Sequence, residues 1–269
     1  MAFSPSIRII LLAVMLTQVN CTPGSLGGQQ VDLQREALPE DPVTLLRVAD
    51  SKWAEGRSLT HLARGAAAVE RAHRIAPTYE THWRLSRFYA AISEGVEQRN
   101  LRTRFIDAAL DHANQAVALK PSKPEGYGTL AVARGYQARN MLAPGRSTQK
   151  LIEEAAEALY DDHPTYDEGL GHRVLGGLYA QAPPWPAGVG DLESAIEILQ
   201  ENIEQFPNSA LTHFFLGEAY LKFGRSGLAK AAFLKVLSAP RAGEWAIVGA
   251  SYRTKARRYL SSIREGGSP

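Results

Sequence analysis

The stretch that decides the fold covers residues 210–240 and reads ALTHFFLGEAYLKFGRSGLAKAAFLKVLSAP. Apolar residues recur in it at helical spacing on both sides of Gly224, a residue suited to a turn. Small residues at Gly217 and Ala229 allow two antiparallel helices to approach closely, and Pro240 stops the second helix. The stretch therefore predicts a pair of helices that must bury its apolar face against neighbours.

The spacing within this pair is similar to that of the 34-residue tetratricopeptide (TPR) repeat. With Ala210 as the first position, small and large apolar residues fall where the repeat has them. These residues are Leu216, Gly217, Tyr220, Gly224, Ala229 and Phe233. A TPR array is a helical solenoid with a concave surface and no built-in chemistry, so the resemblance implies a binding or scaffold protein.

Weaker copies of the pair are expected upstream, because one repeat cannot bury its apolar face alone. The Leu-Gly-x-x-Tyr signature recurs at residues 175–179, and a second helix is expected over 191–207. Another pair is expected to begin at 83–89 and to end with a helix over 104–119, joined by a long turn, SEGVEQRNLRT. The remaining pairs are expected over 43–56 with 59–75, and over 127–136 with 148–160.

Five prolines mark the ends of these pairs: Pro77, Pro121, Pro164, Pro207 and Pro240. They are separated by 44, 43, 43 and 33 residues, so four units are longer than a plain TPR and one matches it. We therefore predict an all-α fold, a TPR-like right-handed α-solenoid of about five helix pairs.

Residues 244–264 predict an amphipathic C-terminal helix that caps the solenoid. Its apolar residues recur at three- and four-residue steps. The opposite face carries Arg253, Lys255, Arg257, Arg258 and Arg264. We expect a solvated face here and no nucleic-acid partner, because 30 Lys and Arg against 28 Asp and Glu leave a net charge of only +2.

The N-terminus predicts export. Residues 1–20 combine a positive charge with the apolar run IILLAVML, which is too short to span a bilayer and fits a signal peptide. The only cysteine, Cys21, follows, and the segment resembles a bacterial lipoprotein signal in which that cysteine is lipidated. Gln18 and Asn20 depart from the usual residues of such signals, so ordinary signal-peptidase cleavage stays the alternative.

Three segments follow from this N-terminus. Residues 1–20 are the expected signal peptide, residues 21–41 a flexible tether, and residues 42–266 a single TPR-like domain. We expect a periplasmic protein that meets the membrane through its lipid anchor only. Because no second cysteine is present, the fold must rest on helix packing without a disulfide.

Motifs of catalysis are absent from the sequence. It contains no G-x-S-x-G, H-E-x-x-H, Walker-type loop or C-x-x-C, and its seven histidines are scattered. The acidic cluster DDHPTYDEGLGH matches no metal-binding spacing, and Asp167 within it is expected to cap a helix. We predict no enzymatic activity, no cofactor and no metal.

An insertion, AQAPPWPAGVGD, follows Tyr179 and places Trp185 among prolines and glycines. An aromatic side chain on a stiff loop is either a ligand contact or a lid over the core, and the sequence leaves both interpretations open. We predict that a ligand or partner contacts Tyr89, Tyr127, Tyr179 and Trp185.

The region LGGLYAQAPPWPAGVGDLESAIEIL, with its lipoprotein-like leader and stretched repeats, resembles the TatT-type component associated with TRAP transporters. The match is carried by Gly176, Tyr179, Ala182, Pro183, Gly190, Asp191 and Ala195. Residues 187–190 depart from the adjacent glycine pair common in that family.

The resemblance implies a protein that associates with the solute-binding protein of a TRAP transporter and handles a small apolar or organic-acid ligand. It also implies a homo-oligomer, since members can form trimers. The alternative is a generic cell-envelope TPR scaffold that docks a peptide or an assembly partner and has no small-molecule ligand.

Overall fold

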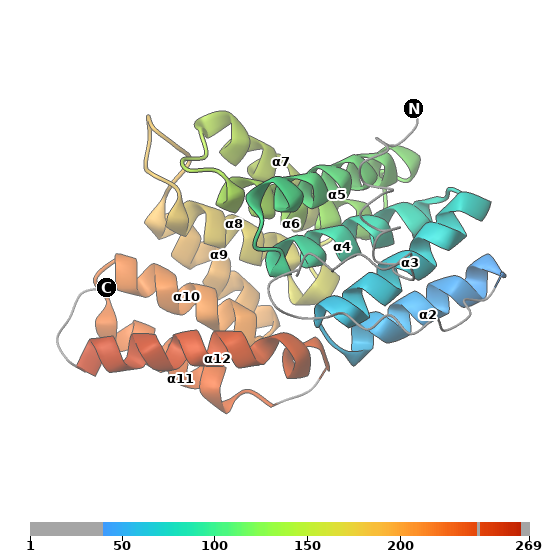
Figure 1. Ribbon diagram of the computed structural model, residues 1–269. Coiled ribbons are helices and arrows are strands. Elements are labelled where there is room, and N and C mark those ends of the chain that lie inside the picture. Colours follow the sequence, from blue (N-terminus) through green and yellow to red (C-terminus); the bar gives the residue numbers. More distant parts are fainter. Residues whose placement is uncertain (1–39, 241–242, 265–269) are drawn as a thin grey trace. The chain divides into compact units, whose positions relative to one another are not determined.

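The computed structural model describes residues 40–240 and 243–264 (Figure 1). Regular structure in these ranges consists of eleven α-helices and one short 3₁₀ helix, which confirms the predicted all-α class. The helices form two compact units that divide between Ser122 and Lys123. A single domain over 42–266 stays a prediction, and Cys21 with the predicted signal peptide lies outside the described residues.

The first unit contains two antiparallel helix pairs. Its helices are α2 (Pro42–Glu55), α3 (Leu59–Ile75), α4 (Tyr79–Gly95) and α5 (Arg99–Leu119). Each helix packs against the next along the chain. The side chains of Leu62, Leu85, Phe88 and Ile106 are fully buried, so the core lies along the seams between these helices.

The second unit contains three helix pairs and the C-terminal helix. Its helices are α6 (Pro124–Asn140), α7 (Arg146–Asp162), α8 (Leu170–Gln181), α9 (Leu192–Gln205), α10 (Ala210–Lys222), α11 (Ser226–Ser238) and α12 (Gly243–Arg264), with the 3₁₀ helix η1 (Tyr166–Glu168) before α8. Consecutive helices pack together, and α8 also contacts α10, as first helices of neighbouring repeats do. Among the helices of the described ranges, none has the length and apolar character of a membrane-spanning segment.

The five prolines predicted to close the helix pairs all do so. The second helices of the five pairs end at Ile75, Leu119, Asp162, Gln205 and Ser238. Each of these residues lies two positions before a predicted proline. Proline lacks an N–H and clashes with the preceding turn, so it stops each second helix at the same point of the repeat.

Close helix approach occurs at the glycines that the repeat pattern identifies. A Cβ atom on Gly217 would lie 2.7 Å from the Phe233 ring, and one on Gly176 would lie 2.4 Å from Leu199. Phe233 and Leu199 are both fully buried. In both pairs, therefore, a large side chain of the second helix packs directly over a glycine of the first.

The backbones of α7 and α8 approach closely at Gly171. A Cβ atom on Gly171 would lie 2.6 Å from the backbone nitrogen of Tyr160 and 3.0 Å from the carbonyl oxygen of Ala156. Backbone atoms of a helix cannot rotate away. We therefore expect Gly171→Ala to lower the free energy of unfolding by about 1–3 kcal/mol, measured by urea denaturation.

Gly135→Ala is the matched control, because a Cβ atom at this position of α6 meets nothing within 4 Å. Alanine has the higher helix propensity, so this substitution is expected to stabilise by about 0.5–1 kcal/mol. Opposite signs for the two variants are the expected result. A stabilising Gly171→Ala would show that α7 and α8 lie farther apart.

The predicted long turn SEGVEQRNLRT is wrong. Helix α4 continues to Gly95 and α5 begins at Arg99, so only three residues separate them. The cause is that Leu101 and Phe105, one turn apart, are both buried and extend the apolar face of α5 backwards. Arg102 also donates a hydrogen bond to the Val96 carbonyl and closes the turn. The residues by which this repeat exceeds the length of a plain TPR therefore lengthen its helices.

Helix α12 packs on α10 and α11 as the predicted C-terminal cap. Its Tyr259 ring stacks on Phe233, with centroids 4.9 Å apart. One residue of the expected basic face is misplaced, because Arg253 is buried, with 6% of its surface exposed. It donates to the Ala239 carbonyl, which ties α12 to the end of α11, and its guanidinium lies over the Trp245 ring of its own helix.

Candidate functional site

The insertion between α8 and α9 is ordered by its own backbone and presents Trp185 to solvent. We call residues 182–191 the Trp185 loop. The Gly190 N–H donates to the Pro183 carbonyl at 2.9 Å, and the Asp191 N–H donates to the Tyr179 carbonyl at 3.1 Å. Trp185 is 74% exposed, so the interpretation of this side chain as a lid packed over the core is wrong.

A buried glutamine holds the Trp185 loop in place from another helix. Gln149, near the start of α7, is only 2% exposed. Its Oε1 accepts a hydrogen bond from the Val189 N–H at 3.0 Å, and its Nε2 donates to the Pro144 carbonyl at 2.9 Å. One side chain thus ties the Trp185 loop to the loop between α6 and α7, and both lie at the same end of this unit in Figure 1.

The loop between α6 and α7 is also apolar and exposed. Leu142 is 94% exposed and Met141 is 42% exposed. We call Met141, Leu142 and Trp185 the loop surface, because Gln149 fixes the two loops that carry them. Large apolar side chains exposed on two loops that one buried side chain joins make these loops a candidate contact surface.

Two of the predicted tyrosines pack into different clusters of the second unit. Tyr127 packs against the cluster that contains Ala131 and Leu159, whereas Tyr179 packs against the cluster that contains Phe214. The Tyr179 hydroxyl donates to Glu153 at 2.8 Å, and burial followed by this hydrogen bond raises its pKa. The structure does not place these two tyrosines in one cluster, and their contact with a ligand stays a prediction.

Tyr89, the remaining predicted residue, lies in the first unit and is 3% exposed. Its hydroxyl donates to Glu70 Oε1 at 2.7 Å. Burial raises the pKa of both the Glu70 carboxyl and the Tyr89 phenol. The Tyr89 ring also lies beside His112, with ring centroids 5.8 Å apart, so this tyrosine adjoins the histidine group described next.

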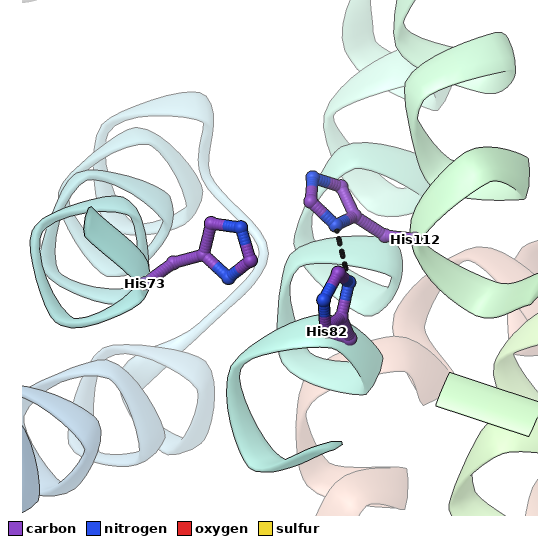
Figure 2. A group of neighbouring side chains, drawn as sticks. All are labelled: His73, His82 and His112. Carbon is purple, nitrogen blue, oxygen red and sulfur yellow. Dashed lines mark hydrogen bonds between the residues drawn. The ribbon is translucent and has the colours of Figure 1, made fainter. Parts of the chain in front are cut away.

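Three histidines that are far apart in the sequence meet in the first unit. His73 comes from α3, His82 from α4 and His112 from α5, and Figure 2 shows the His73 ring turned toward the other two. Each offers a ring nitrogen, and these nitrogens lie within 4.8 Å of one another. The expectation that the histidines are scattered is therefore wrong for these three, because the fold brings them together.

The histidine group is compact and partly shielded. The Nδ1 atoms of His82 and His112 are 3.0 Å apart, and one of them donates to the other. The His73 ring centroid lies 4.7 Å from that of His82 and 5.3 Å from that of His112. His112 is buried, whereas His73 and His82 are half-buried. Imidazole nitrogens in such a group can hold a metal ion.

The acidic cluster at residues 161–172 forms a structural turn. Asp167 does not cap a helix, because it lies inside η1 with φ 46° and its carboxylate accepts a hydrogen bond from Arg173. Arg173 is 5% exposed and also donates to the Glu168 carbonyl. Helix α8 instead begins after Gly169, whose backbone is left-handed. The buried arginine holds the carboxylate away from the backbone N–H groups that a cap would serve.

The residues that sequence reasoning missed share one signal. Gln149 and His112 are polar residues at apolar positions of their helices. Gln149 lies three residues before the buried Ile152, and His112 lies three residues after the buried Ala109. A polar residue on a buried face requires a partner, so this pattern could have identified both the loop anchor and one member of the histidine group.

Comparison with known proteins identifies the fold. No family model matches the chain, and no curated protein matches it in sequence. The structure is similar to TTC0263, a thermophilic TPR protein of Thermus thermophilus, with a TM-score of 0.63 and 20% identity over 82% of this chain and 100% of that chain. It also resembles MamA protein, with a TM-score of 0.47 and 16% identity over 81% of this chain and 94% of that chain. The first likeness, together with the five proline-terminated helix pairs, shows a TPR fold.

Proposed function

We propose that this protein is a non-catalytic TPR protein that binds a partner protein through the loop surface. The observation that carries the proposal is the exposure of Trp185, at 74%, on a loop that Gln149 and backbone hydrogen bonds hold in place. Tryptophan is among the residues that contribute most to protein interfaces. An aromatic side chain kept in water by an ordered loop is well explained by a partner that covers it.

The anchoring of the loop also favours affinity. A flexible loop loses conformational freedom on binding, and this loss opposes association. Here Gln149 bridges the two loops through the Pro144 carbonyl and the Val189 N–H before any partner arrives. Leu142 and Trp185 are therefore presented on a surface that needs little further ordering.

We assign the partner as the solute-binding protein of a TRAP transporter, with a small apolar or organic-acid ligand passing between the two proteins. This assignment rests on the resemblance of the segment around Tyr179, Gly190 and Asp191 to TatT-type proteins. Titration of the purified chain with a TRAP solute-binding protein from the same genome, followed calorimetrically, tests it. Saturable binding is expected, whereas heat of dilution alone would contradict this partner and favour an envelope scaffold with a different one.

The location that fits this function is the periplasm, with the chain anchored by a lipid on Cys21. Metabolic labelling with palmitate is expected to mark the wild type and not Cys21→Ala, because a thioether needs the sulfur and no other cysteine is present. Ser25→Ala, which keeps the cysteine, is the control and should be labelled like the wild type. Equal labelling of Cys21→Ala would contradict the anchor.

A further inference from the structure

We propose that His73, His82 and His112 bind a divalent transition-metal ion of the Zn²⁺ class within the first unit. The three side chains come from three consecutive helices, α3, α4 and α5. Their candidate ligand nitrogens lie within 4.8 Å of one another, and Figure 2 shows the rings gathered around a common space. The proposal is independent of the loop surface and of any protein partner.

The hydrogen bonds around Thr81 fix the tautomer of His73. The Thr81 hydroxyl donates its only proton to the Thr78 carbonyl at 2.8 Å and accepts the Thr78 N–H at 3.0 Å. Its Oγ1 lies 2.9 Å from His73 Nδ1 and can only accept there, so His73 Nδ1 carries the proton. The lone pair of His73 therefore lies on Nε2, which is available to a metal. Outer partners of metal-binding histidines act in this way.

The contact between His82 and His112 suits a shared cation. Two Nδ1 atoms 3.0 Å apart can hold only one proton between them, so one lone pair already points at the other ring. Two nitrogens bound to a tetrahedral Zn²⁺ at about 2.0–2.1 Å are separated by about 3.3 Å. The pair is thus close to the required separation, and coordination through both atoms requires the donating ring to carry its proton on Nε2 and both lone pairs to turn toward the ion. The ligand nitrogen of His73 lies within 4.8 Å of those of the other two histidines, so a tetrahedral site requires this half-buried side chain to move toward them.

The protonation state of the group also favours a metal. Burial, and then the neighbouring imidazoles, lower the pKa of His82 to about 4 and that of His112 to about 3. Burial lowers the pKa of His73 as well. All three rings are therefore neutral at pH 7, which is the form that coordinates metals.

The ligand set selects the class of ion. Three imidazoles suit Zn²⁺, Ni²⁺, Co²⁺ and Cu²⁺, whereas Mg²⁺ and Ca²⁺ prefer oxygen ligands. Three protein ligands leave a tetrahedral ion one open position for water or an external ligand. An ion held here would link the end of the first helix pair to both helices of the second.

The test uses the tag-free mature chain with Cys21→Ser, so that neither a histidine tag nor a thiol supplies ligands. We expect one Zn²⁺ per chain by calorimetry, and a Tm higher by about 5–10 °C at a Zn²⁺ concentration about 100 times Kd. Co²⁺ should give the visible absorption of a tetrahedral nitrogen site. Mg²⁺ and Ca²⁺ should change nothing.

The variants His73→Gln and His82→Gln are each expected to weaken Zn²⁺ binding at least about 10-fold, while His163→Gln in the second unit leaves it unchanged. Circular dichroism in EDTA establishes that each variant is folded. If a variant fails to fold, the Co²⁺ spectrum of the wild type still tests the site. Absence of one-to-one Zn²⁺ binding, or unchanged binding in both folded variants, would overturn the proposal.

Discussion

Phe233→Ala is expected to lower the free energy of unfolding by about 3–5 kcal/mol, the range for truncating a fully buried aromatic side chain. Phe233 is 0% exposed. Its ring packs over Gly217 and stacks on Tyr259, with ring centroids 4.9 Å apart. The Phe214 ring lies beside it, with ring centroids 5.9 Å apart. Gly217 has no side chain that could move into the cavity left by the truncated ring. Helix α12 covers the other side of Phe233, so the cavity stays largely unfilled.

The matched control is the next residue of the same helix. Leu234 is 48% exposed, so Leu234→Ala should change stability by no more than about 0.5 kcal/mol. Urea denaturation followed by far-UV circular dichroism measures both variants. Similar losses for the two substitutions would contradict the register in which position 233, and not 234, faces the core.

Much of the fold follows from short-range sequence features, because each TPR helix is set by local rules. Proline excludes a continuing helix, and glycine or alanine at a crossing point permits close packing, so Pro207, Gly217 and Ala229 define their helices without any distant contact. The wrong prediction of a long turn at SEGVEQRNLRT also has a cause within the segment itself. The burial of Leu101 and Phe105 extends α5, although charged residues around them are typical of a turn.

The candidate sites depend on contacts that the sequence does not encode locally. Gln149 anchors Val189 from 40 positions away, and His82 meets His112 from 30 positions away. Both contacts require the register between neighbouring helices. The insertion around Trp185 is recognisable by its composition, but its exposure depends on Gln149, a residue with no motif of its own.

Trp185→Ser is the substitution with the largest expected effect on binding. Removing a central interface tryptophan typically costs about 2 kcal/mol or more, which corresponds to an affinity loss of about 30-fold. The side chain is 74% exposed in the free chain, so its removal should leave the Tm of the protein nearly unchanged. A loss of affinity without a loss of stability distinguishes a binding residue from a structural one.

Leu228→Ser provides the control, because Leu228 is 47% exposed on α11 of the same unit and is not part of the loop surface. The central claim is that the loop surface binds the partner protein, and the calorimetric Kd of the TRAP solute-binding protein for the three chains tests it most directly. We expect wild type and Leu228→Ser to bind alike and Trp185→Ser to bind about 30-fold more weakly. Equal affinities for all three chains would contradict the claim.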